Sequence, residues 1–191
     1  KNAKGELVCK KPFPSMPIKF WNDNKHKKYS SAYFEKFKNI WHHGDFAKVT
    51  DDGGFVIFGR SDTTLNPGGV RLGTSEIYNV VEKFKEIQES LVIGQSWNND
   101  IRIILFVVLN KGYFLSEEIK SKIKIKIRSS ASPRHVPAKI ISISEIPKTK
   151  NGKIVELAVK QTIEGEEIKN LEVLANPDSL KCFKNIKELD E

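Results

Sequence analysis

The sequence is poor in cysteine. Its 191 residues include two cysteines, Cys9 and Cys182, which lie near opposite ends of the chain. They have neither the spacing of metal ligands nor the density of a disulfide framework, which excludes a small disulfide-stabilised secreted domain. We interpret both cysteines as reduced thiols and expect an intracellular, cytoplasmic protein.

The sequence also lacks a long apolar run and a signal-like beginning. The apolar stretch IRIILFVVL (101–109) is well short of the about 20 residues that span a bilayer, so we expect a buried strand and no membrane partner. The chain begins KNAKGELV, without a methionine or an apolar leader, so we expect a piece of a longer polypeptide. Its length fits one large domain or two small ones.

Acidic residues are fewer than basic ones. Asp and Glu number 24 against 32 Lys and Arg, which gives a net charge of +8. This balance permits anionic partners such as nucleotides, CoA, nucleic acid or a membrane surface, and charge alone does not choose among them. Aromatic residues are not interleaved with the basic runs as a base-stacking surface requires, so we expect no nucleic-acid partner.

The first third of the chain predicts mainly strands. GELVCKKP (5–12) indicates a strand that ends at a proline, MPIKFWND (16–23) a second strand, and YSSAYFEKFKNI (29–40) a short helix. Two apolar runs flank Asp51-Asp52-Gly53-Gly54, which is a strong tight-turn signal. This pattern predicts a β-hairpin over residues 42–60.

The pattern changes after the hairpin, where the polar, turn-rich stretch SDTTLNPGG begins. We place a domain boundary or hinge at Ser61 and Asp62. Downstream, TSEIYNVVEKF predicts a helix that Thr74 or Ser75 could cap. SEEIKSKIKIKIRSS has isoleucines at both helical and strand spacing, and a Ser116 cap followed by two glutamates favours a helix.

The other elements expected in this part are strands at 90–97, 101–109 and 138–144, a turn at 98–100, a helix at 154–163 and a charged, helical tail. The sequence therefore predicts an α+β fold, in which a β-rich first part precedes a small domain of about three strands and three helices.

Polar residues around the hairpin are candidates for ligand binding. An ionised Asp45 could accept two hydrogen bonds from vicinal ribose hydroxyls, or it could form a turn after Gly44. Arg60 could bind ribose or phosphate oxygens while the torsions of Asp62 change between domain orientations, or the two could form a surface ion pair. The two histidines of WHHGD suggest a metal, but no second cluster supplies further ligands, so we expect no metal site.

Two later loops place basic residues beside glycines. Gly68, Gly69 and Gly73 surround Arg71; such glycines let a backbone approach a ligand, and arginine binds phosphate bidentately, although tight turns use the same residues. Lys153 follows a glycine in a loop between a strand and a helix. Its ammonium could bridge two anions and stabilise developing negative charge, or it could be a solvent-facing turn lysine.

Four stretches in order, WHHGD, GRSDTTLNPGGVRLGTSEIY, SPRHVP and PKTKNGKIVELAVK, resemble the carboxyl-terminal portion of the adenylate-forming superfamily of acyl-CoA synthetases, luciferases and nonribosomal adenylation domains. The second and fourth more narrowly resemble the acetoacetyl-CoA synthetase subgroup. The likeness runs from about Gly5 to Leu180. It implies that residues 1–61 are the carboxyl-terminal end of the large adenylation domain and that residues 62–191 are the small mobile lid.

The resemblance implies roles in adenylation for four residues. Lys153 matches the lysine that is essential for this half-reaction. Asp45 matches the aspartate that holds the ribose hydroxyls of the adenylate. Arg60 matches an arginine that contacts the nucleotide, and Arg71 one that helps to bind phosphate and to shape the thioester-forming site.

The resemblance implies further roles in domain rotation and CoA binding. Asp62 matches the hinge residue between the large and small domains. Gly69 matches a residue that lines the pantetheine path, and Arg128 lies where relatives place an arginine near the CoA 3′-phosphate. Many relatives have an arginine or lysine three residues after the catalytic lysine, whereas this chain has Glu156, which fits the acetoacetyl subgroup.

The implied activity is that of an AMP-forming acetoacetate:CoA ligase, which adenylates the acid with Mg-ATP and then transfers it to CoA after the lid rotates. Mg²⁺, ATP and the acid are implied to bind mainly to an amino-terminal domain, a partner that this chain lacks, so we expect the chain alone to be inactive. One alternative is a ligase for acetate, propionate or another short carboxylate. Another is a non-catalytic basic binding module.

Overall fold

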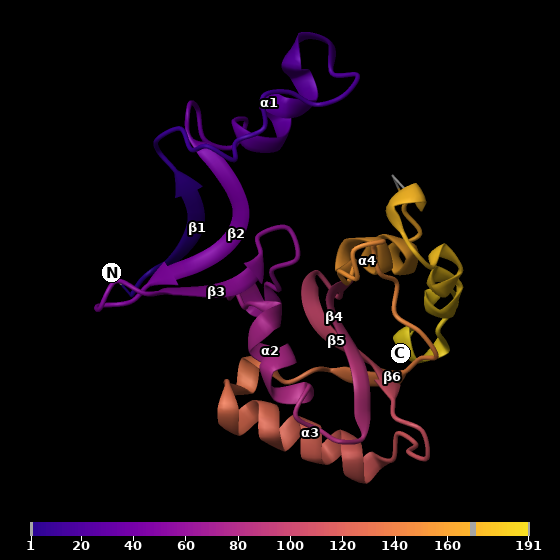
Figure 1. Cartoon of the computed structure of the whole chain (residues 1–191). Coiled ribbons are helices and arrows are strands. Elements are labelled where there is room, and N and C mark those ends of the chain that lie inside the picture. Colours follow the sequence, from indigo (N-terminus) through magenta and orange to yellow (C-terminus); the bar gives the residue numbers. More distant parts are fainter. Residues whose placement is uncertain (1, 169–170, 191) are drawn as a thin grey trace. The chain divides into compact units, whose positions relative to one another are not determined.

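The structure is a computed structural model that describes residues 2–168 and 171–190 (Figure 1). The chain separates into two compact units, Lys1–Asp62 and Thr63–Glu191, so the division falls beside the expected boundary. Each unit contains a three-stranded sheet. The assignment of the units to a large domain and a lid stays a prediction, as does the role of Asp62 as a hinge.

The first unit contains an antiparallel sheet. Its strands are β1 (Lys4–Cys9), β2 (Trp41–Val49) and β3 (Phe55–Arg60), in that spatial order. The Thr50 N–H donates to the Gly54 carbonyl at 2.8 Å, and Gly53 has a φ of +88°. Because glycine adopts positive φ at little cost, this turn joins β2 and β3 without strain, and the predicted hairpin is confirmed.

The predicted strand at 16–23 is wrong. Pro17 lacks the N–H that a strand ladder uses, and Asn22 has a φ of +52°, in the left-handed region. The segment forms turns, and the Phe20 ring lies edge-on to the Tyr29 ring with their centroids 5.6 Å apart. Aromatic packing therefore takes the place of strand pairing.

The helix predicted at 29–40 begins and ends earlier. The observed helix α1 spans Lys27–Tyr33, and Phe34 leaves the helical conformation with a φ of −127°. The Tyr33 ring stacks on the Trp41 ring of β2, with centroids 3.7 Å apart and 15° between the planes. This contact with the sheet outweighs the helical pattern of the residues that follow.

The second unit combines a mixed sheet with three α-helices in the part of it that is described. Its strands are β4 (Ile87–Trp97), β5 (Asp100–Leu109) and β6 (Lys139–Ser142), and its helices are α2 (Thr74–Val81), α3 (Glu117–Ser130) and α4 (Glu156–Glu164). β4 and β5 are antiparallel, whereas β5 and β6 are parallel and are connected through α3, as a parallel pair requires. The predicted small α+β domain is confirmed.

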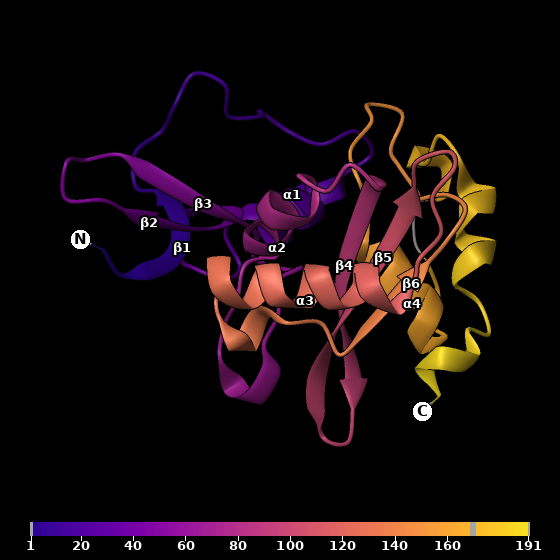
Figure 2. The ribbon, with the colours of Figure 1, turned by 90° about the horizontal axis from the view of Figure 1, so that it is seen from below.

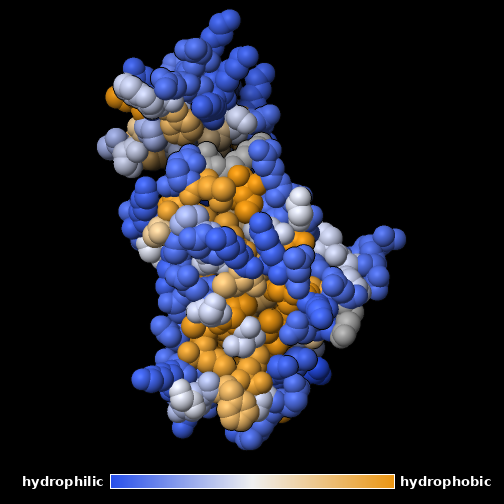
Figure 3. Space-filling model, turned by 90° about the vertical axis from the view of Figure 1, so that its right-hand side faces the viewer, coloured by the Kyte–Doolittle hydropathy of each residue, from blue (hydrophilic) through white to orange (hydrophobic). Residues whose placement is uncertain are grey.

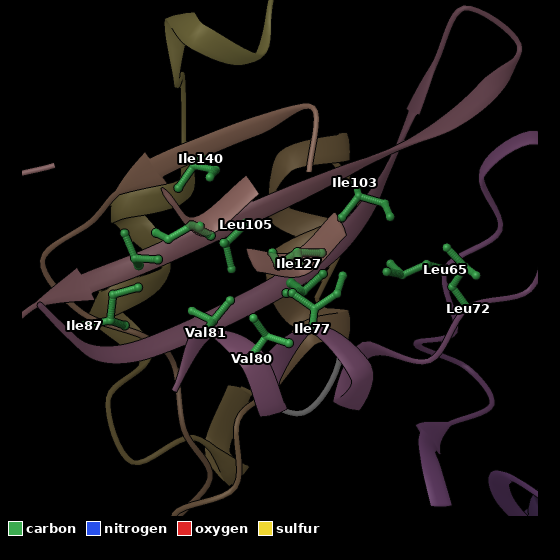
Figure 4. Packing of buried hydrophobic residues seen from close by; sticks show 13 residues of the cluster. Leu65, Leu72, Ile77, Val80, Val81, Ile87, Ile103, Leu105, Ile127 and Ile140 are labelled. Atoms are coloured by element: carbon green, nitrogen blue, oxygen red, sulfur yellow. The ribbon is translucent and has the colours of Figure 1, made fainter. Parts of the chain in front are cut away.

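Two layers enclose the sheet of the second unit. Helices α2 and α3 pack on one face, and α4 with the carboxyl-terminal segment packs on the other (Figures 1 and 2). Along β5, Ile103 and Leu105 belong to the first core, which Figure 4 shows, while Ile104 and Phe106 belong to the second. The apolar run at 101–109 is therefore a strand with both faces buried, as predicted.

The helix starts show one error and one success. The Gly73 N–H donates to the Glu76 carboxylate at 3.3 Å and Thr74 is the first helical residue, so the prediction that Thr74 or Ser75 caps α2 is wrong. Helix α3 is confirmed, and the Ser116 hydroxyl accepts from the Ile119 N–H at 3.3 Å.

Over residues 171–190, the carboxyl-terminal segment forms short 3₁₀ turns rather than the predicted helical tail, and residues 169, 170 and 191 of that prediction lie outside the described residues. These turns are Leu171–Val173, Pro177–Phe183 and Lys187–Leu189. They contribute Leu180, Phe183 and Leu189 to the second core. Helix α4 covers only part of this face of the sheet, and these residues bury the rest.

Some apolar side chains remain at the surface. Phe55 and Ile57 of β3 are 61% and 46% exposed. Figure 3 shows one face of the molecule, on which apolar residues lie exposed among hydrophilic ones. None of the helices in the described part of the chain has the length and apolar character that crossing a membrane requires.

Candidate functional site

Lys153 lies in a tight hairpin at the surface of the second unit. Lys148 and Ile154 pair across the hairpin, and the Thr149 N–H donates to the Lys153 carbonyl at 2.8 Å. The Lys153 N–H donates to the Thr149 hydroxyl at 3.1 Å, and Gly152 supplies the positive φ of +76° that the turn needs. The backbone of Lys153 is thus fixed by hydrogen bonds while its side chain is exposed.

The carboxyl-terminal segment supports this hairpin from outside. The Lys150 N–H donates to the Val173 carbonyl at 3.2 Å, and the Ala175 N–H donates to the Lys148 carbonyl at 2.8 Å. Because these bonds hold the arm and the tip of the hairpin, the structure presents the lysine on a supported turn rather than on a loose loop.

Asp45 and Arg60 are neighbours in the sheet of the first unit. They are paired residues of β2 and β3. Gly44 has a φ of +89°, a conformation that favours glycine, and a Cβ there would lie 3.1 Å from the guanidinium nitrogens of Arg60. The Asp45 carboxylate lies 2.8 Å from Nδ1 of His43.

Arg60 and Asp62 form the ion pair that one interpretation of the sequence proposed. Nε and Nη2 of Arg60 donate to the two Asp62 oxygens at 3.3 and 3.2 Å. The two side chains are 56% and 49% exposed, and exposed pairs of this kind contribute little stability. Both groups border a hollow of about 560 Å³ that is also lined by His42, His43 and Gly44. An anionic or hydroxyl-bearing ligand could therefore displace the pair at small cost.

Sequence reasoning missed Glu6, which organises this region from β1. Its carboxylate accepts hydrogen bonds from Lys36 and Ser61 and lies 3.1 Å from Nε2 of His42. Burial alone would raise the pKa of Glu6, but the hydrogen bonds from Lys36, Ser61 and His42 outweigh burial and lower the pKa to about 2. The available signal was a lone glutamate within the apolar strand pattern GELV.

Replacing Glu6 by glutamine is expected to destabilise the protein in a pH-dependent way. Because the folded-state pKa of about 2 is below the ordinary value of 4.5, the stabilisation is complete above pH 4.5 and is lost as the pH falls towards 2. At pH 7 the variant should lose up to about 3 kcal/mol, and the gap from wild type should close between pH 4.5 and 2. Urea unfolding of both proteins across this range measures the gap.

The control for that experiment is Glu35→Gln, which changes an exposed glutamate. We expect this variant to unfold like wild type at every pH. A Glu6→Gln deficit that stays constant from pH 7 to pH 2 would contradict the assignment of the lowered pKa to Glu6.

Gly69 and Arg71 lie on one ordered loop of the second unit. Leu65 and Leu72 exchange backbone hydrogen bonds of 2.9 and 2.8 Å across this loop. The Gly68 N–H donates to both oxygens of the Asp100 carboxylate at 2.9 and 3.0 Å. Hydrogen bonds from the N–H groups of Ile101 and Gly68 lower the pKa of Asp100. These bonds hold the backbone on which Arg71 is exposed.

The remaining candidates lie on separate elements. Gly69 lines a polar hollow of about 600 Å³ together with Asn66, Trp97 and Asp100. Arg128 is exposed in the last turn of α3, and Lys153 lies in its own hairpin. The structure thus groups Asp45, Arg60 and Asp62 in the first unit and Gly69 with Arg71 in the second. The ligand-binding roles of all these residues stay predictions.

Known proteins match this chain along its length. Residues 76–153 match the family described as AMP-binding enzyme C-terminal domain. Acetoacetyl-coenzyme A synthetase of Rhizobium meliloti (strain 1021) is 58% identical over 189 residues, which cover 99% of this chain and 29% of that protein. Acetoacetyl-CoA synthetase of Xenopus tropicalis is 50% identical over 187 residues, which cover 97% of this chain and 28% of that protein.

A solved structure agrees with these sequence matches. Acetoacetyl-CoA synthetase from Streptomyces lividans aligns with a TM-score of 0.90 and 39% identity, and the alignment covers 100% of this chain and 29% of that chain. The present chain therefore spans less than a third of the length of these relatives. The chain is therefore similar from end to end to acetoacetyl-CoA synthetases, and the similarity is to the carboxyl-terminal part of such enzymes, where residues 76–153 match the AMP-binding enzyme C-terminal domain.

Proposed function

We propose that this chain is the carboxyl-terminal part of an AMP-forming acetoacetate:CoA ligase. The observation that carries the proposal is the 58% identity to an acetoacetyl-CoA synthetase over 99% of the chain. In the proposed reaction, the acid carboxylate attacks the α-phosphorus of ATP and releases pyrophosphate. The CoA thiol then attacks the acyl carbon of the adenylate and releases AMP.

Lys153 is proposed to serve the first step. Its exposed ammonium would lie between the attacking carboxylate and the α-phosphate, where it would reduce their repulsion and stabilise the charge of the transition state. The fixed backbone of the hairpin supports this role, because a positioned charge loses less energy to reorganisation than a mobile one.

The first unit is proposed to hold the nucleotide. Asp45 would accept hydrogen bonds from the ribose hydroxyls, and Arg60 would exchange its bond to Asp62 for a bond to the nucleotide. Such an exchange would release Asp62 to change its torsions as the second unit rotates. After rotation, Arg71 and Gly69 would face the site of thioester formation, with Arg128 near the 3′-phosphate of CoA.

Mg²⁺ is proposed to accompany ATP rather than to be held by this chain. Within residues 2–168 and 171–190, no three His, Cys, Asp or Glu side chains form a group that could hold a metal ion. We propose that the ion and the acyl group bind to other parts of the enzyme, and we expect this chain alone to be inactive. A cytoplasmic location is proposed with it, and Cys9 and Cys182 are both free thiols.

The acid that the enzyme accepts is tested with the complete protein. With ATP, Mg²⁺ and CoA, we expect acetoacetate to support AMP release at least tenfold faster than acetate, propionate or butyrate at equal concentration. Equal or higher rates with another short acid would assign the enzyme to that acid and leave the reaction class intact. A complete protein that releases AMP with none of these acids would contradict the ligase proposal.

A further inference from the structure

A tyrosine hydroxyl joins three elements of the second unit. The Tyr78 hydroxyl, from α2, donates to the Glu156 carboxylate at 2.9 Å. The same oxygen accepts the backbone N–H of Val92, from β4, at 3.0 Å. Glu156 is the first residue of α4 and follows Lys153 by three positions. One hydroxyl therefore connects α2, β4 and the start of the helix that leaves the Lys153 hairpin.

The tyrosine hydroxyl binds to the outer edge of the sheet, where a strand N–H has no neighbouring strand to pair with. β4 is an outer strand of the order β4-β5-β6, and the Val92 N–H is satisfied by the tyrosine. The ring of Tyr78 packs against the core under α2, which fixes its hydroxyl in place. A buried N–H that loses its partner is costly, so the bond at Val92 resists rearrangement.

A second link ties the other arm of the hairpin to the same strand. The Lys148 ammonium forms an ion pair with the Glu89 carboxylate of β4. Lys148 pairs with Ile154 across the hairpin. The first arm of the hairpin is therefore fastened to β4 through Glu89, and the helix that follows the second arm is fastened to β4 through Tyr78.

Resting on the proposed function, we propose that Tyr78 is a positioning residue for adenylation, which holds Glu156 and so fixes the base of the Lys153 hairpin. The link also gives Glu156 a physical role. A carboxylate at this position accepts a hydrogen bond from the tyrosine hydroxyl, which also contacts β4 through the Val92 N–H.

The Tyr78 hydroxyl keeps its proton and so can donate the hydrogen bond to Glu156 at every assay pH. Burial and the nearby charge of Glu156 raise the pKa of Tyr78 well above 10. The hydroxyl therefore remains a donor to Glu156 throughout the pH range in which such an enzyme is assayed.

The test measures the two half-reactions of the complete protein separately. For Tyr78→Phe, we expect the rate constant of acid-dependent ATP–pyrophosphate exchange to fall about 10- to 100-fold, because the lost bonds let the lysine shift. The KM for ATP should stay within threefold of wild type. Thioester formation from supplied acyl-adenylate and CoA should stay within twofold, since Lys153 does not serve that step.

Matched variants distinguish positioning from folding. Glu156→Gln keeps an acceptor oxygen and should retain activity within about threefold, whereas Glu156→Ala should behave like Tyr78→Phe. The double variant Tyr78→Phe/Glu156→Ala should be no slower than either single variant. Tyr113→Phe removes an exposed hydroxyl and should act as wild type.

Three outcomes would overturn the proposal. They are an equal loss in both half-reactions, wild-type exchange in Tyr78→Phe, and losses that multiply in the double variant. A separate measurement needs no substrate: backbone hydrogen exchange at Gly152 and Lys153 should be about tenfold faster in Tyr78→Phe than in wild type. If the wild-type enzyme proves inactive with every acid, the proposed function fails, and unchanged hydrogen exchange would separately exclude the link as a support of the hairpin.

Discussion

Replacing Lys153 by alanine is expected to lower acid-dependent adenylation by about 10²- to 10³-fold, the size of effect seen when a positioned group that stabilises a transition state is removed. The exposed side chain makes no contribution to either core, so the fold should persist. Thioester formation from supplied acyl-adenylate should remain within a few-fold of wild type. Pyrophosphate exchange and single-turnover thioester assays on the complete protein measure the two rates.

Lys150 provides the matched control for this experiment. It is an exposed lysine of the same hairpin, and its contact with the carboxyl-terminal segment is made by its backbone N–H. Lys150→Ala removes the same charge within the same turn and should retain adenylation within about twofold. Equal losses in the two variants would mean that the general positive charge of the hairpin, and not a positioned ammonium, supports the reaction.

Replacing Phe106 by alanine is expected to lower the free energy of unfolding of the second unit by about 3–5 kcal/mol. Phe106 is fully buried in β5, and its ring meets the Phe183 ring edge-on with centroids 5.0 Å apart. Truncation leaves a cavity between the sheet and the carboxyl-terminal segment. Since small domains are stable by only about 5–15 kcal/mol, the urea midpoint should shift clearly.

Phe114 is the control for the core substitution. Its side chain is 75% exposed, so Phe114→Ala should change the free energy of unfolding by less than about 0.5 kcal/mol. A Phe106→Ala loss below about 1 kcal/mol, or a Phe114→Ala loss of equal size, would show that the second core is less tightly packed than the structure indicates.

Elements with strong local signals could be predicted from the sequence. The turn Asp51-Asp52-Gly53-Gly54 defines the hairpin because glycine tolerates the conformation that a tight turn needs. Helix α3 could be predicted because Ser116 caps it and because a helix buries Ile123 and Ile127 while leaving Ile125 67% exposed. Both features depend on neighbours that are close in the sequence.

Features that depend on distant partners could not be predicted. The segment at 16–23 has an apolar pattern, but the rings of α1 decide its conformation. Glu6 gains its low pKa from Lys36, His42 and Ser61, which are remote in sequence. The sequence shows that Glu156 follows Lys153 by three residues, but it does not show that Glu156 binds Tyr78, which lies far away along the chain. The candidate site thus follows from the motifs, and its supports follow from tertiary contacts.

The sheet of the second unit is a partition between two separately filled compartments. Side chains of adjacent β5 residues enter opposite compartments, so a change of volume on one side reaches the other mainly through the backbone. Core substitutions in one compartment should therefore have little effect on the packing of the other. The hydrogen bond between Tyr78 and Glu156 joins α2, on one face of the sheet, to α4, on the other face. A substitution at either residue therefore affects the packing on both faces.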